Sequence, residues 1–211
     1  MKKLLILLFS FFLLSSPSVF ADDISDFQME GISIGDSLLD YMSEDEIIKG
    51  IEHSLDIYDF SYLKEPYKYV QMKIKKDFPV YSDGLSVMIK NNSINQYLTD
   101  KNEKYTILSI RGSINYIDDF DGCLQKRNEI VEIFSSKFPN AKKGEYFVNY
   151  SPDPSGKSII DGIDIIFATG GEIEAQCFKM DQNFRIKTGW KDGLDIGLDS
   201  KETAKWMTEY K

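Results

Sequence analysis

The sequence has few of the side chains that most often carry out catalysis. Among 211 residues there is one histidine, His53, and there are two cysteines, Cys123 and Cys177. A serine or cysteine nucleophile needs a base beside it, and a zinc site normally needs several His or Cys ligands. We therefore expect no Ser-His or Cys-His hydrolase, no Gly-x-Ser-x-Gly nucleophile elbow and no zinc. The sequence predicts no catalytic residue and a protein that is not an enzyme.

Positive charge is also scarce. The chain has 25 Lys and Arg residues against 34 Asp and Glu, which gives a net charge of −9 at pH 7. Binding to nucleic acid or to an anionic membrane surface needs clustered Lys and Arg, so neither is expected. The same charge favours a neutral or basic protein as the partner.

Long apolar runs are confined to the N-terminus. Residues 1–21 begin with Lys2 and Lys3, continue with an apolar run over residues 4–14, and end in a small-residue segment before Asp22. This pattern is typical of a secretory signal peptide, and the run is shorter than the roughly 20 residues of a membrane span. We expect cleavage near Ala21, no stable membrane anchor, and a periplasmic or secreted protein.

The two cysteines are expected to form a disulfide, because such a compartment is oxidising. Alternation over residues 172–180 places Cys177 on the apolar face of a strand, and helical spacing places Cys123 on the apolar face of a helix. Both should point into the layer between helix and sheet. A redox-active pair is the alternative, but the Cys-x-x-Cys spacing typical of such pairs is absent.

The order of periodic segments predicts an α+β fold. Two capping boxes, Ser33 with Asp36 and Ser43 with Glu46, predict a pair of short helices. Strand patterns occupy residues 67–74, 84–90, 105–116, 145–150, 159–168, 172–180 and, as a further candidate, 184–190. A long helix over about residues 119–138 separates the strands into two groups, and a short helix capped by Asp199 or Ser200 ends the chain.

Runs of adjacent strands between helices predict antiparallel sheet with helices on one face. The order also allows a tandem helix-plus-three-strand repeat. We therefore expect residues 22–211 to form a single domain, with halves at 22–117 and 118–211 as the alternative division.

Residues 151–158, Ser-Pro-Asp-Pro-Ser-Gly-Lys-Ser, end like a phosphate-binding loop. Ser151 stands where that loop has glycine, and Pro152 and Pro154 each lack an N–H that could donate to phosphate. A strand pattern rather than a helix follows. These residues are predicted to form a hairpin loop that binds no nucleotide.

Acidic residues leave two kinds of site open. Asp192, Asp195 and Asp199 are spaced around two glycines, where they either wrap a calcium ion in oxygen ligands or form two tight turns before a helix cap. A pair of carboxylates across a cleft would suit a glycosidase, although most acidic residues are expected to be solvated. The sequence predicts no cofactor other than this calcium ion.

The stretch Gly31-Ile32-Ser33, followed by a helical pattern from Ile34 and a strand meander, resembles the opening of outer-membrane assembly lipoproteins of the SmpA/OmlA type. It covers about a third of the chain, and the lipobox cysteine is absent. The stretch is also similar to small secreted proteins of marine alphaproteobacteria. The first resemblance implies a non-enzymatic protein-binding or envelope-assembly module. The alternative is a carboxylate-dependent hydrolase or a small-ligand-binding protein.

Overall fold

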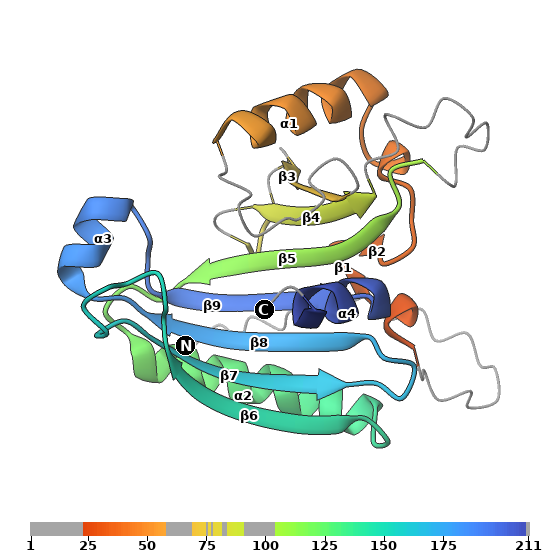
Figure 1. The fold of residues 1–211 in the computed structure, drawn as a ribbon. Helices are drawn as coiled ribbons and strands as arrows, with labels where there is room; N and C mark the ends of the chain where they lie inside the picture. Colours follow the sequence, from red (N-terminus) through yellow and green to blue (C-terminus); the bar gives the residue numbers. More distant parts are fainter. Residues whose placement is uncertain are drawn as a thin grey trace, which may run out of the picture.

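The fold is built on one seven-stranded antiparallel sheet, seen in a computed structural model of the chain (Figure 1). The structure describes residues 23–57, 69–74, 76, 78–81, 84–90 and 104–209. The predicted signal peptide at residues 1–21 lies outside these residues. No helix within the described ranges is long and apolar enough to cross a membrane.

The sheet combines strands from both halves of the chain. The strands are β3 (Tyr69–Ile74), β4 (Leu85–Lys90), β5 (Ile107–Asn115), β6 (Lys142–Asn149), β7 (Ile159–Ile166), β8 (Glu172–Lys179) and β9 (Gly193–Asp199). Their order is β3-β4-β5-β9-β8-β7-β6. Two meanders thus meet where β9 pairs with β5, and the main hydrophobic core contains residues of both halves.

One face of the sheet is apolar and supports the long helix α2 (Phe120–Lys137). Alternation places Ile173, Ala175 and Cys177 of β8 on this face, fully buried. α2 packs over β7, β8 and β9, and the Cys123–Cys177 disulfide joins helix to strand. The predicted long helix and the predicted disulfide are confirmed, and the structure shows Asp119 as the N-cap of the helix.

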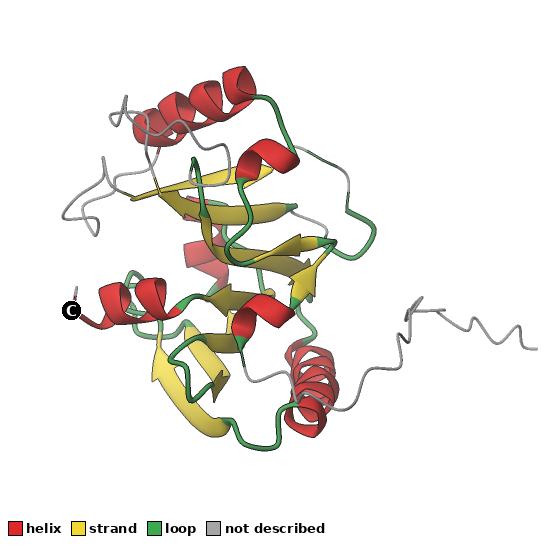
Figure 2. Ribbon diagram, turned by 90° about the vertical axis from the view of Figure 1, so that its right-hand side faces the viewer, coloured by secondary structure: helices red, strands yellow, loops and turns green. Residues whose placement is uncertain are grey.

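Two further helices frame the sheet. α1 (Glu44–Ile57) packs on β3, and its capping box forms as predicted: the Ser43 N–H donates to Glu46, and the Glu46 N–H donates to the Ser43 hydroxyl. α4 (Lys201–Glu209) packs on β5 and β9, from the side opposite α2 (Figures 1 and 2). The Ser200 hydroxyl accepts from the Thr203 N–H, so Ser200 is the cap of α4.

The α+β class and the antiparallel sheet are as predicted, but the helices do not share one face, since α4 lies opposite α2. The two tight turns that were the alternative around Asp195 are instead the strand β9. Two further local predictions are wrong. Instead of a helix from Ile34, the chain forms the ribbon β1 (Gln28–Met29) and β2 (Ile32–Ser33) and a single 3-10 turn, η2 (Leu38–Asp40). Asp36 accepts the Ser33 N–H, as in a capping box, without a helix following. The candidate strand at 184–190 is the helix α3 (Gln182–Thr188), which ends at Gly189 in the left-handed conformation. One further 3-10 turn, η1 (Ile24–Asp26), precedes β1.

Candidate functional site

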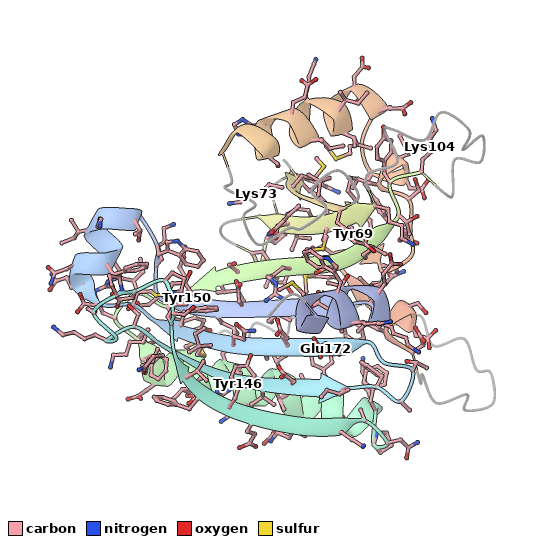
Figure 3. All side chains as sticks on the ribbon, in the orientation of Figure 1. Tyr69, Lys73, Lys104, Tyr146, Tyr150 and Glu172 are labelled. Atoms are coloured by element: carbon pink, nitrogen blue, oxygen red, sulfur yellow. A yellow bond between two sulfur atoms is a disulfide. The ribbon has the colours of Figure 1, made fainter. Side chains whose placement is uncertain are left out.

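The sheet face opposite α2 is polar. Residues opposite each other in the strand register share a face, so the polar set can be read from the pairing. Over β5 to β6 it includes Arg111 and Ser113 on β5, Asp195, Gly197 and Asp199 on β9, Glu172, Glu174 and Gln176 on β8, Asp164 on β7, and Lys142 and Tyr146 on β6. Figure 3 shows Tyr146 and Glu172 on this face, which α4 covers only at one end. We call this set the polar face.

Two glycines allow large side chains to lie flat on the polar face. A Cβ at Gly197 would come within 2.8 Å of the Arg111 guanidinium, and a Cβ at Gly162 would overlap the Tyr146 ring. Arg111 is the register partner of Gly197, and Tyr146 is the register partner of Gly162. Each long side chain therefore reaches across a neighbouring glycine toward the acids of the central strands.

Arg111 is the cation around which the acids gather. Its Nη2 lies 2.5 Å from a Glu174 carboxylate oxygen and 3.2 Å from an oxygen of Asp199. Burial acts to lower the pKa of Arg111, but the carboxylates of Glu174, Asp199 and Asp195 raise it above its ordinary value. Arg111 therefore stays charged and offsets part of the acidity around it.

Three acids on the polar face hold protons more tightly than usual. Burial, together with the nearby Glu174 carboxylate, raises the pKa of Asp164 to about 6 and that of Glu172 to about 7. Burial also raises the pKa of Asp199, against the pull of Arg111. One Asp164 carboxylate oxygen, Oδ1, is buried and has no hydrogen-bond partner among the described residues. On these strands the five carboxylates of the polar face thus outnumber its cations, Arg111 and Lys142.

An aromatic cluster adjoins the polar face near α3. The Tyr150 ring lies 5.4 Å from Trp190, 5.8 Å from Phe184 and 6.1 Å from Phe178, measured between centroids. Phe178 follows Glu174 and Gln176 on the same face of β8. Trp190 is 48% exposed. The cluster offers ring faces to solvent beside the acidic part of the sheet, and single-residue patterns gave no signal for it.

The three aspartates of the predicted calcium site have separate protein partners. Asp192 accepts from the Met180 and Asp118 N–H groups and pairs with Arg185 at 3.1 Å. The other two lie on β9: the Ser113 hydroxyl donates to Asp195, and Arg111 pairs with Asp199. Within the described ranges, no group of three or more His, Cys, Asp or Glu side chains is arranged to hold a metal ion. Calcium binding stays a prediction that this arrangement does not support.

The loop of residues 151–158 is organised by one carboxylate. Asp153 accepts from the N–H and hydroxyl groups of both Ser155 and Ser158. The Ser158 hydroxyl donation, followed by the other serine groups, lowers the pKa of Asp153 well below its ordinary value, against its desolvation. The loop joins β6 to β7 as predicted, and an acid occupies its centre, where a phosphate-binding loop has backbone donors.

The Gly-x-Ser-x-Gly spacing does occur, at residues 31–35, contrary to our expectation from the sequence. Its serine, Ser33, lies in β2 and is buried. A nucleophile elbow instead places an exposed serine on a strained turn between strand and helix. His53 is exposed on α1. Residues 31–35 therefore have the spacing of the motif but not the structure of a nucleophile elbow.

A hollow of about 750 Å³ lies between α1, β3 and the N-terminal ribbon. Its charged lining is mixed: Glu30, Asp40, Glu46, Lys49, Lys73 and Lys76. The Tyr41 hydroxyl, also at this hollow, donates to Asp36, and burial together with that carboxylate raises the pKa of Tyr41 to about 12.

Comparison with known proteins adds no assignment: no family model, curated protein or solved structure matches this chain. The resemblance to SmpA/OmlA-type lipoproteins stays a prediction. The helix expected from Ile34, on which it rested in part, is replaced by a single 3-10 turn, η2.

Proposed function

We propose that the protein is an exported, non-enzymatic binding module, and that its polar face holds a basic segment of a partner protein. One observation carries this proposal. Over the described strands β5, β9, β8 and β7, a single arginine shares the face with five acids, Asp164, Glu172, Glu174, Asp195 and Asp199. A partner's Lys or Arg side chains would relieve the repulsion among these acids.

The disulfide supports the exported state. Cys123 and Cys177 are bonded and buried, and such bonds persist in oxidising compartments. The N-terminal Lys-apolar-Ala pattern supports the same conclusion. The location that fits both observations is the periplasm or the extracellular space.

A defined probe tests the binding site. Residues 22–211 would be titrated with a lysine-rich peptide and with a glutamate-rich peptide of equal length, by fluorescence anisotropy. We expect the basic peptide to bind, and its affinity to fall with added salt. E172Q/E174Q should weaken binding about tenfold, as loss of close charge pairs does. The matched control is E129Q/E132Q on exposed positions of α2.

The enzyme alternative is tested on the same protein samples. Glu172 has the raised pKa that a general acid needs. The wild type and E172Q would be assayed with ester, glycoside, phosphate and peptide substrates. Turnover that E172Q abolishes, without any binding of the basic peptide, would make the hydrolase the better conclusion.

The hollow beside α1 supports a second candidate, small-ligand binding, because its volume of about 750 Å³ is in the range of small-molecule sites. Thermal shift with a panel of metabolites tests it. A hit should be weakened in Lys49→Ala, which removes a charged side chain from the lining of the hollow, and should be retained in E172Q/E174Q.

A further inference from the structure

Along the edge strand β6, every second residue directs its backbone N–H and C=O groups away from the sheet. β6 is the last strand in the order, and β7 is its only neighbour among the described strands. Immediately after β6, the Tyr150 N–H donates to the Ser158 carbonyl at 2.8 Å. Inward and outward groups alternate along an antiparallel strand. The backbone N–H and C=O groups of Lys143, Glu145 and Phe147 therefore point away from β7, toward solvent.

The side chains around this edge are also exposed. Phe147 is 62% exposed and Val148 is 45% exposed, and Ile166 on the neighbouring strand is 40% exposed. α2 packs over β7, β8 and β9. It therefore does not cover the edge of β6 that faces away from β7. A long edge strand with apolar side chains is a template for pairing with another strand.

We propose that a second copy of this chain pairs with β6 in antiparallel orientation, about a two-fold axis beside Gly144. Charge complementarity favours this occupant and this register. Lys143 would lie opposite the partner subunit's Glu145, and Glu145 opposite the partner subunit's Lys143. These residues share a face of the strand and already lie 2.8 Å apart within one chain. The two Gly144 residues that would face each other at the axis carry no side chains.

Other occupants and registers fit less well. A basic segment would bring its cations against Lys142 and Lys143, at the start of β6. A register shifted by one residue, with Glu145 at the axis, would set two carboxylates opposite each other, which is destabilising. In the proposed register the two sheets become one, and both polar faces lie on the same side. This dimer is independent of the proposed function, and its test contains no partner.

Sedimentation equilibrium on residues 22–211 measures this association, from about 1 to 200 µM, where interfaces of modest size associate. We expect a monomer–dimer equilibrium. K143E and E145K should each raise the dimer dissociation constant at least about tenfold, because like charges then lie opposite each other. The double swap K143E/E145K should restore association.

An equimolar mixture of the two single variants should also restore it, because a chain that is acidic at both positions then faces a chain that is basic at both. Only a contact between chains predicts this rescue. The matched control exchanges charge on α2, K126E/E129K, at an exposed ion pair of similar length. A wild type that stays monomeric throughout, or a dimer that single variants leave unchanged, would overturn the proposal.

Discussion

The guanidinium of Arg111 lies over Gly197, its register partner on β9, so closely that a Cβ there would come within 2.8 Å of Nη2. This position lets Arg111 reach both Glu174 and Asp199. The missing side chain at residue 197 thus sets where the one arginine of the polar face sits among its acids.

Gly197→Ala should therefore displace Arg111 and weaken its two ion pairs. We expect a loss of about 1–3 kcal/mol in the free energy of unfolding, the usual cost of overpacking, measured by urea denaturation. Gly144→Ala is the control, because its added methyl meets nothing within 4 Å. Equal stability of the two variants would contradict this account of Gly197.

Loss of the disulfide should be costly. Cys123 and Cys177 are 54 residues apart, and a loop of this length is worth about 4 kcal/mol in the chain-entropy model. The C123S/C177S variant should lose stability of that order in the same urea experiment. Reductant should lower the melting temperature of the wild type and leave that of the variant unchanged.

Glu172 should make stability depend on pH. Its pKa is about 7 in the folded protein against an ordinary value of 4.5. Because the folded state binds the proton more tightly, this residue costs no stability below pH 4.5, and its cost grows until the pH passes 7. Carboxyl groups whose pKa is lowered in the folded state, such as that of Asp153, make stability rise with pH instead. The effect of Glu172 is therefore isolated by comparing the wild type with E172Q. We expect E172Q to raise the melting temperature at about pH 8 and to leave it unchanged at about pH 4. A difference that is constant with pH would show that Glu172 acts through packing alone.

The loop of residues 151–158 should depend on its aspartate and be indifferent to its lysine. Asp153→Ala removes the acceptor for both serines, so it should lower the melting temperature and open the loop to limited proteolysis. Lys157→Ala should change neither property, because Lys157 is exposed. ATP should give no thermal shift with any of the three proteins. Nucleotide binding that Lys157→Ala abolishes would reverse this conclusion.

The elements that could be predicted from the sequence depend on local patterns. The capping box of Ser43 with Glu46 started α1, and the apolar spacing around Cys123 marked the face of α2 that meets β8. Period-two alternation located β3 to β8, but it missed β9, whose residues were predicted to be calcium ligands or tight turns. Such signals work because cap hydrogen bonds and side-chain periodicity act within a few residues.

The polar face was decided only in the tertiary structure. Arg111, Glu174 and Asp199 come from three strands, and their encounter depends on β9 lying between β5 and β8. The local pattern at Ser33 and Asp36 formed its hydrogen bond without the helix it predicted. Pairing between distant strands sets which charges meet and how deeply they are buried, so the raised pKa values of Asp164 and Glu172 follow from packing that no short stretch of sequence encodes.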